Sequence, residues 1–414
     1  MRVPVGRARG RSLALLVLLS WAAAAPASER TYAWVQYVAG GVEVRAVAAA
    51  RAGADGTVET RAGCPILQID GVEQPMAERQ LPAGALGGTA GEFPVAVCTA
   101  RLPPHAARVT VDGTALPLPK ARPVRIALLG DTGCRTPLED CTSTWALPAV
   151  AQAIAARRPD LIIHLGDYLY RERGCLIDLC GYGWLPWRAD FMDAAADWLF
   201  PAAPLILVRG NHEGCGRAAK GWFLLFDADP PPAQCPGMTR AWSVDIGSAN
   251  LVVTDNAAAD DRLATDVAIY RNALEAAGIV PGRPNWIIGH RPVWGAVGGG
   301  HWLNATLQAA YAGRLSDVSL ILSGHIHTTE LIEMSGRPGQ LILGTGGADL
   351  AAAVPADTLI GTSAAGAVVT RAYTRAGYGF ALLEEEGGVW RISVIDDQNR
   401  LVVRCDAALR CAAP

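Results

Sequence analysis

The amino-acid sequence predicts an α/β protein with a β-rich segment at its N-terminus. After residue 123, apolar runs of strand length alternate with alanine-rich runs of helix length, which is typical of a sheet whose strands are connected by helices. Residues 28–122 instead contain short runs, several of alternating polarity, between glycine-rich turns, as in all-β structure. In the α/β part, short polar motifs follow the strand ends, where open α/β sheets bind their ligands.

Length and composition exclude several classes of protein. The chain has 414 residues, enough for about two domains that each bury a core. Apolar residues make up 51% of the sequence and charged residues 18%, which excludes intrinsic disorder. The formal charge is -3 and basic residues gather in no stripe, so we expect no dedicated nucleic-acid partner.

Residues 1–27 have the features of a secretory signal peptide. Four non-adjacent arginines precede the apolar run from Ser12 to Leu19, which is too short for a confident membrane span, and the sequence Ala-Pro-Ala follows at residues 25–27. Cleavage would leave 32 basic and 39 acidic residues. We expect a secreted or periplasmic protein without a transmembrane segment after cleavage. An uncleaved N-terminal anchor is the alternative.

The ten cysteines lie as five pairs of sequence neighbours, which indicates five local disulfides in an oxidising compartment. Metal ligation by thiolates is the alternative, but the sequence contains no C-x-x-C pair. The predicted pairs are Cys64 with Cys98, Cys134 with Cys141, Cys175 with Cys180, Cys215 with Cys235 and Cys405 with Cys411.

The N-terminal segment, residues 28–122, is expected to form a small β-sandwich domain. Its end is marked by prolines 117, 119 and 123, which favour an extended linker, so we place a domain boundary between residues 122 and 123. Five strands are expected, at residues 34–37, 42–47, 66–69, 94–98 and 108–111.

Residues 123–414 are expected to form one α/β domain. Its first half alternates strands with helices near residues 143–157 and 188–199. The expected strands are at residues 124–129, 161–165, 205–208, 251–253, 286–288, 320–322, 341–343, 379–383, 389–395 and 401–403.

Five polar motifs in this domain each follow an expected strand. One such motif is weak, because Gly-Asp after a strand is usually a turn and a lone histidine is usually a core residue. Five of them are a strong signal, because strand ends can bring them together. The motifs are Gly130-Asp131-Thr132-Gly133, Gly166-Asp167-Tyr168-Leu169-Tyr170, Gly210-Asn211-His212-Glu213, Gly289-His290 and Gly324-His325-Ile326-His327.

The residue types in these motifs are ligands of hard to intermediate cations and fit a pair of metal ions. Tyr170 lies three residues after Asp167, so a tight turn can bring its oxygen to the same ion. A phenolate ligand favours a trivalent ion such as Fe(III), because the metal must lower the proton affinity of the phenol.

Over about residues 124–345 the motifs resemble those of the calcineurin-like metallophosphoesterases, and the variant is similar to the purple acid phosphatases. Ordinary members of the superfamily have a histidine where this sequence has Gly133, whereas in purple acid phosphatases a tyrosine, here Tyr170, replaces the lost ligand. The resemblance implies a four-layer αββα sandwich, which in larger members follows an N-terminal β-sandwich. It also implies two metal ions, Fe(III) with Zn, Mn or Fe(II).

The resemblance further implies the role of each site residue. Asp167 is expected to bridge the two ions. His212 is expected to contact phosphate and act as general acid. His301, beyond glycines 298–300, is a second catalytic candidate, although its spacing from His290 departs from the family and an exposed loop histidine is the alternative. The other expected metal ligands are Asp131, Tyr170 and His327 on one side, and Asn211, His290 and His325 on the other.

The activity implied is hydrolysis of small phosphate monoesters by a metal-activated hydroxide, as in an acid phosphatase. A phosphodiesterase or nucleotide hydrolase on the same scaffold is the main alternative, because the metals and the water serve either ester. A metal-binding envelope protein without activity is a further alternative. We expect the segment from Cys175 to Trp187 to select the substrate. The sequence does not indicate an oligomeric state.

Overall fold

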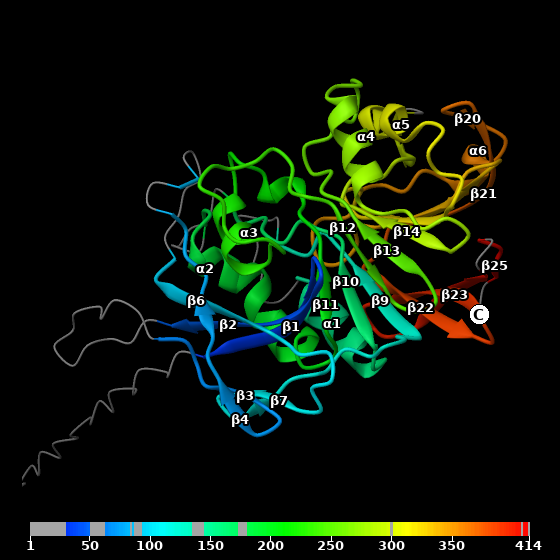
Figure 1. The fold of residues 1–414 in the computed structure, drawn as a ribbon. Helices are drawn as coiled ribbons and strands as arrows, with labels where there is room; N and C mark the ends of the chain where they lie inside the picture. The colour runs from blue at the N-terminus through cyan, green and yellow to red at the C-terminus, as the bar shows by residue number, and fades with distance from the viewer. Residues whose placement is uncertain are drawn as a thin grey trace, which may run out of the picture.

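The computed structural model describes residues 30–49, 63–82, 85–86, 93–134, 145–172, 180–298, 301–406 and 409–412. The predicted signal peptide, Cys141 and Cys175 lie outside these residues. Two large sheets pack face to face, and helices cover their outer faces (Figure 1). The predicted αββα sandwich after an N-terminal β-region is confirmed.

The first sheet has eleven strands in the order β25-β24-β23-β22-β9-β10-β11-β1-β2-β6-β5. Its centre is parallel and consists of β9 (Arg125–Leu129), β10 (Leu161–His164) and β11 (Leu205–Leu207). The flanking strands are β1 (Tyr32–Val38), β2 (Gly41–Ala49), β5 (Ala77–Glu78), β6 (Val95–Arg101), β22 (Gly379–Glu386), β23 (Val389–Asp396), β24 (Leu401–Asp406) and β25 (Cys411–Ala412).

The second sheet has eight strands in the order β12-β13-β14-β17-β19-β18-β21-β20. Strands β13, β14, β17 and β19 are parallel to one another, and the others are antiparallel to their neighbours. The bounds are β12 (Trp242–Asp245), β13 (Asn250–Val253), β14 (Asn285–Ile288), β17 (Val318–Ser323), β18 (Thr329–Met334), β19 (Gly339–Leu343), β20 (Ser363–Ala364) and β21 (Ala367–Arg375).

Helices bury the outer face of each sheet. Five helical segments contribute to the core on the first sheet, including two π-helical turns in the predicted helix near residues 188–199, and three helices cover the second sheet. The first set is α1 (Leu147–Ala156), α2 (Trp184–Trp187), η1 (Arg188–Met192), η2 (Ala195–Leu199) and α3 (Ala219–Leu225). The second set is α4 (Val267–Ala276), α5 (Ala305–Tyr311) and α6 (Ala356–Leu359).

Strand β9 shows why the sequences of the central strands are continuous apolar runs. Ile126 and Leu128 point into the core between the two sheets, whereas Ala127 and Leu129 point into the core under the helices. Because successive side chains of a strand face opposite sides, a strand covered on both faces is apolar throughout.

The N-terminal β-region is a sandwich that shares a sheet with the α/β part. Strand β1 pairs with β2 and also, in parallel, with β11 through Gln36 and Leu205. A second small sheet, β4-β3-β7-β8, packs on β1 and β2 around a separate apolar core. One sheet therefore crosses the predicted boundary between residues 122 and 123, which stays a prediction. The small-sheet strands are β3 (Leu67–Ile69), β4 (Val72–Gln74), β7 (Val109–Val111) and β8 (Thr114–Ala115).

Two buried arginines attach this N-terminal region to the end of α3. Arg45 of β2 and Arg79, just after β5, donate hydrogen bonds to backbone carbonyls that the helix leaves without a partner in its last turn. A cation also suits the negative end of the helix dipole. The carbonyl acceptors are those of Leu225 and Asp227 for Arg45, and those of Phe223, Leu224, Asp227 and Asp229 for Arg79.

Three predicted disulfides are confirmed, Cys64–Cys98, Cys215–Cys235 and Cys405–Cys411. Cys134 and Cys180 are also disulfide-bonded, and their predicted partners lie outside the described residues. Disulfides of this number indicate an extracytoplasmic compartment. Among the described residues, no helix combines the length and the apolar character that crossing a membrane requires.

Candidate metal centre

The predicted ligands converge at the carboxyl ends of parallel strands from both sheets. The first sheet supplies residues that follow β9, β10 and β11, and the second sheet supplies residues that follow β14 and β17. In chain order these residues are Asp131, Asp167, Tyr170 and Asn211 from the first sheet, and His290, His325 and His327 from the second.

Three of these residues have left-handed backbone conformations. The φ angles are 57° at Asp131, 58° at Asp167 and 70° at His325. Residues other than glycine adopt this region rarely and at a cost, and such residues cluster at functional sites. Each of the three follows a glycine at the end of its strand, so the chain turns sharply there and presents the side chain at the edge of the sheet.

Tyr170 lies at the centre of one half of the cluster. Its Oη atom is 3.0 Å from Asp131 Oδ1, 3.0 Å from Asp167 Oδ2 and 3.0 Å from His327 Nε2. A Cβ atom at Gly133 would lie 2.8 Å from Tyr170 Cδ2 and 2.7 Å from the backbone nitrogen of Tyr170. Position 133 must therefore lack a side chain for Tyr170 to reach the site, which is the physical reason why the glycine and the tyrosine occur together.

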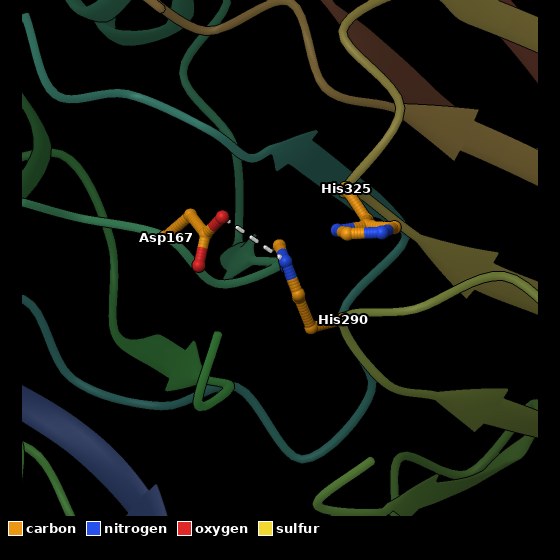
Figure 2. A group of neighbouring side chains, drawn as sticks. All are labelled: Asp167, His290 and His325. Carbon is orange, nitrogen blue, oxygen red and sulfur yellow. Dashed lines mark ion pairs between the residues drawn. The ribbon is translucent and has the colours of Figure 1, made fainter. Parts of the chain in front are cut away.

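The other half of the cluster meets the first at Asp167. His290 Nε2 lies 3.2 Å from Asp167 Oδ2 and 3.0 Å from Asn211 Oδ1. Asp167, His290 and His325 each offer a ligand atom, and these atoms lie within 4.8 Å of one another (Figure 2). The Oδ2 atom of Asp167 thus contacts both Tyr170 and His290.

Hydrogen bonds on the outer side of each ring orient the three histidines. Nδ1 of His290 lies 2.8 Å from the carbonyl oxygen of Leu165, and Nδ1 of His327 lies 2.6 Å from that of Asp349. A carbonyl only accepts, so both rings carry the proton on Nδ1 and keep Nε2 for the centre of the site. In His325 the other ring nitrogen makes this contact: its Nε2 atom lies 3.1 Å from the carboxylate of Asp261.

The pKa shifts in this cluster reflect burial and the charges that lie close together there. Burial raises the pKa of Tyr170 well above its ordinary value, and the carboxylates of Asp131 and Asp167 raise it further. Burial would also raise the pKa of Asp167, but the charges and hydrogen bonds of His290 and His212 bring it well below its usual range. Burial lowers the pKa of His290, but Asp167 outweighs this and raises it to about 9.

When metal ions are not bound, the phenol of Tyr170 therefore keeps its proton and is neutral, and the protonated imidazole of His290 balances part of the carboxylate charge. Metal binding would displace these protons. The donors are carboxylate, amide and phenol oxygens with imidazole nitrogens, divided between two sides of one carboxylate. This donor chemistry fits a pair of hard to intermediate cations.

A model of the calcineurin-like phosphoesterase family matches residues 124–329, which carry all seven of these residues. Residues 124–329 form a calcineurin-like phosphoesterase domain. The resemblance that the motifs predicted is confirmed, and a phosphate ester is the substrate class that the family implies.

Solved structures resemble the chain well beyond this phosphoesterase domain. A purple acid phosphatase from seeds of yellow lupin (Lupinus luteus) is similar with a TM-score of 0.61 and 13% identity, covering 89% of this chain and 72% of that one. The protein PhoD is similar with a TM-score of 0.55 and 12% identity, covering 92% and 91%. At these identities the likeness shows the fold. Among curated proteins no sequence matches the chain at a significant level.

His212, predicted as a catalytic residue of the phosphoesterase domain, lies beside the cluster of predicted ligands. Its backbone N–H donates to Asp167 Oδ1 at 2.8 Å, and its ring packs on that of Tyr170 with 3.9 Å between centroids. Nε2 is 3.9 Å from Asp167 Oδ2, and the side chain is 13% exposed. The ring therefore reaches both the cluster and solvent.

His301, the second catalytic candidate, lies elsewhere. It is exposed and begins β16 (His301–Leu303), which pairs with β15 (Gly295–Val297) in a two-stranded sheet. Across the described residues, no hydrogen bond or ion pair links His301 to the cluster. Its catalytic role stays a prediction.

Glu213 is a buried residue next to the candidate site to which our sequence analysis gave no role. Its buried carboxylate accepts hydrogen bonds from the backbone N–H groups of Asp167 and Gly210 at 3.1 Å, and from those of Tyr168 and Leu169. Burial and the Asp167 charge raise the pKa of Glu213 to about 8, against these N–H groups, which favour the ionised form. Glu213 thereby links the motif that contains Asp167 to the motif that contains Asn211 by hydrogen bonds. Its place directly after Asn211-His212 was the available signal.

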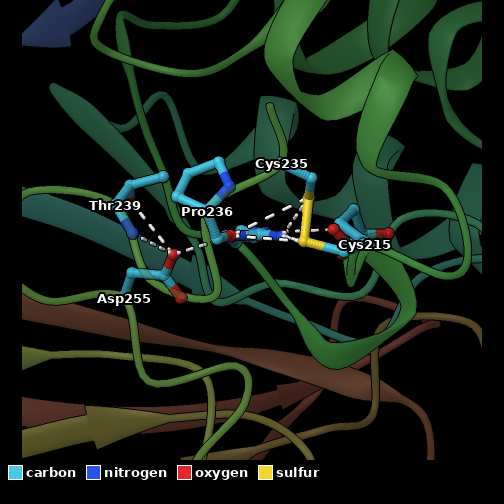
Figure 3. Close-up of a disulfide and its surroundings, with 7 residues drawn as sticks. Cys215, Cys235, Pro236, Thr239 and Asp255 are labelled. Carbon is cyan, nitrogen blue, oxygen red and sulfur yellow. Dashed lines mark hydrogen bonds and ion pairs between the residues drawn. A yellow bond between two sulfur atoms is a disulfide. The ribbon is translucent and has the colours of Figure 1, made fainter. Parts of the chain in front are cut away.

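Arg209, just before the motif of residues 210–213, forms hydrogen bonds that hold this motif in place. Its Nε donates to the carbonyl of Glu213, and Nη1 donates to Pro236 O and Asp255 Oδ2. Nη2 lies 3.6 Å from each sulfur of the Cys215–Cys235 disulfide. Figure 3 shows this disulfide with Pro236 and Asp255 nearby. The disulfide loop is therefore fixed to the segment that carries Asn211 and His212.

Proposed function

We propose that the protein is a secreted or periplasmic, dinuclear metal-dependent phosphoesterase that hydrolyses phosphate monoesters. The supporting observation is the position of Asp167, whose Oδ2 atom lies 3.0 Å from Tyr170 Oη and 3.2 Å from His290 Nε2. One carboxylate between a phenol and an imidazole is the arrangement that two adjacent cations require. We also propose the division into a signal peptide at residues 1–27, a β-rich domain at 28–122 and a catalytic domain at 123–414.

Each side of Asp167 would hold one ion. The phenol oxygen of Tyr170 suits Fe(III), and the other side suits Zn, Mn or Fe(II). Two ions bound there would neutralise the phosphoryl oxygens and lower the pKa of a water molecule. We assign Asp131, Tyr170 and His327 to the first ion, Asn211, His290 and His325 to the second, and Asp167 to both.

The chain's own residues orient the substrate and supply a proton. His212 is held by its backbone N–H bond to Asp167 and by its packing on Tyr170, so its ring stays at the edge of the cluster. From there Nε2 can contact the phosphoryl group and protonate the leaving oxygen. We keep His301 as a second catalytic candidate, which His301→Ala tests by its effect on kcat.

The experiment that tests the proposal compares kcat/KM for 4-nitrophenyl phosphate and for bis(4-nitrophenyl) phosphate on mature protein of known metal content. We expect a preference for the monoester. A preference for the diester would reassign the protein as a phosphodiesterase with the same centre. Hydrolysis of neither ester by protein that holds two metal ions would contradict a phosphoesterase function and favour a metal-binding envelope protein.

A further inference from the structure

A carboxylate outside all five motifs contacts one of the proposed ligands. Asp261 lies in the loop between β13 and α4, and its Oδ2 atom is 3.1 Å from His325 Nε2. The same oxygen forms an ion pair with Arg291, and Oδ1 accepts a hydrogen bond from Asn304 Nδ2 at 2.7 Å. Asp261 is therefore held from three directions in one orientation toward His325.

The proton on His325 follows from what its two neighbours can do. Arg291 Nη1 is also 3.0 Å from His325 Nε2. A guanidinium only donates, so this hydrogen bond would require an Nε2 atom that carries no proton. A bare Nε2 would face the lone pairs of Asp261 Oδ2, which is repulsive. If Nε2 carries the proton, the carboxylate accepts from both His325 and Arg291, and the unfavourable contact that remains is the one between the two donors, Nη1 of Arg291 and Nε2 of His325. His325 then keeps the lone pair of Nδ1 for the centre of the site.

The partner of His325 differs in charge from those of the other two histidines. Backbone carbonyls orient His290 and His327, whereas a carboxylate orients His325. A carboxylate on the outer nitrogen raises the basicity of a ligating imidazole and fixes its orientation more strongly than a neutral acceptor does. Arg291 offsets the added negative charge.

We propose that Asp261 is a positioning residue that holds His325 in the Nε2–H tautomer and thereby strengthens the binding of the second metal ion. The effect on metal binding rests on the function proposed above. The tautomer does not, because it is a property of the protein without metal.

The first test is long-range ¹H–¹⁵N NMR of the histidine rings in metal-free protein at pH 8, above the ordinary pKa of histidine. The chain has seven histidines, and the signals missing in His325→Gln assign those of His325. We expect the Nε2–H tautomer in the wild type. In Asp261→Ala we expect the Nδ1–H tautomer, because Arg291 is then free to donate to Nε2. An Nδ1–H tautomer in the wild type, or no change in Asp261→Ala, would overturn the proposal.

The second test measures the affinity for the second divalent ion by competition with a chelator. Asp261→Asn keeps the size of the side chain and removes its charge, and we expect a loss of about 10- to 100-fold. Asp260→Asn is the matched control, because the Asp260 side chain accepts hydrogen bonds from the backbone N–H groups of Arg262 and Leu263 and, within the described part of the chain, forms no hydrogen bond or ion pair with a proposed metal ligand. Equal affinities of the two variants would overturn the proposed role. A wild-type chain that binds no metal would instead contradict the proposed function, and the tautomer would still decide the role of Asp261.

Discussion

The two halves of the candidate metal centre are oriented by different means. In the half around Tyr170, ligands contact one another directly, with the phenol oxygen 3.0 Å from Asp131, Asp167 and His327. Backbone groups hold this half from outside, through the N–H of His325 to Asp131 Oδ2 and the carbonyl of Asp349 to His327.

In the half around His290, one ligand depends on charged side chains. His325 is held by Asp261, whose side chain is 22% exposed, and by the neighbouring Arg291. Backbone geometry therefore fixes the half around Tyr170, whereas single substitutions near the surface can change the half around His290. Metal affinity and exchange should therefore differ between the two halves.

The largest effect is expected from Asp167, which belongs to both halves. Asp167→Asn removes the charge that faces Tyr170 and His290, so we expect activity to fall by on the order of a thousandfold or more. Metal analysis should show that both ions are lost or weakened. Asp197→Asn, at an exposed ion pair with Arg30, is the control. A variant with full metal content and turnover would contradict the bridging role.

A large but selective effect is expected from His212, which contacts Asp167 and Tyr170 but is not one of the proposed metal ligands. His212→Ala removes the proposed proton donor, so the loss should be about a hundredfold or more for esters with poor leaving groups and smaller for nitrophenyl esters. Metal content should stay at the wild-type level. Equal losses for both kinds of ester would indicate that His212 binds phosphate and does not act as the acid.

Gly133→Ala is expected to disrupt only the half of the candidate metal centre around Tyr170. The added Cβ would lie under 3.0 Å from Tyr170 and from the carbonyl oxygen of Tyr168, so the tyrosine must move. We expect a loss of about 1–3 kcal/mol in the free energy of unfolding, and the loss of one metal ion. Gly237→Ala is the matched control, because a Cβ there meets no atom within 4 Å. A Gly133→Ala protein with wild-type stability and two ions would refute this account of Tyr170.

The smallest effect concerns Asp227, a buried carboxyl outside both halves that serves as a reference for pH dependence. Burial raises its pKa from 3.8 to about 7, so the folded protein binds this proton more tightly than the unfolded chain. This proton therefore stabilises the folded state below the ordinary aspartate pKa of 3.8, and the stabilisation is lost as pH rises through about 7. Asp227→Asn should be more stable than the wild type at pH 8, by on the order of 1 kcal/mol.

Urea unfolding at pH 5 and pH 8 measures this difference. Asp197→Asn, which changes an exposed carboxylate paired with Arg30, should leave the pH dependence unchanged. If the free energy of unfolding of Asp227→Asn depends on pH as in the wild type, that dependence arises from other groups, those of the metal centre included.

Much of the centre could be predicted, because its residues follow strands. Asp131 and Asp167 end neighbouring parallel strands, and His290 and His325 end neighbouring strands of the second sheet. Parallel strands present their carboxyl ends at one edge, so order along the chain is enough to bring such motifs together.

The rest depends on contacts that local sequence does not encode. Asp261 lies in a loop without a motif, and its contact with His325 follows from the path of that loop over the second sheet. Strand β18 escaped prediction because the buried Glu330 interrupts its apolar pattern, and that carboxylate accepts hydrogen bonds from Ala296 and Thr328. The pairing of β1 with β11 joins residues far apart in the chain.

The most direct test of the two-ion centre is the number of metal ions bound per chain, measured by mass spectrometry of the elements in protein matured in an oxidising compartment. We predict two ions in the wild type, and one in both His327→Ala and His290→Ala, each variant losing the ion of its own half. A wild-type chain that holds one ion or none after saturation with iron and zinc would contradict the account.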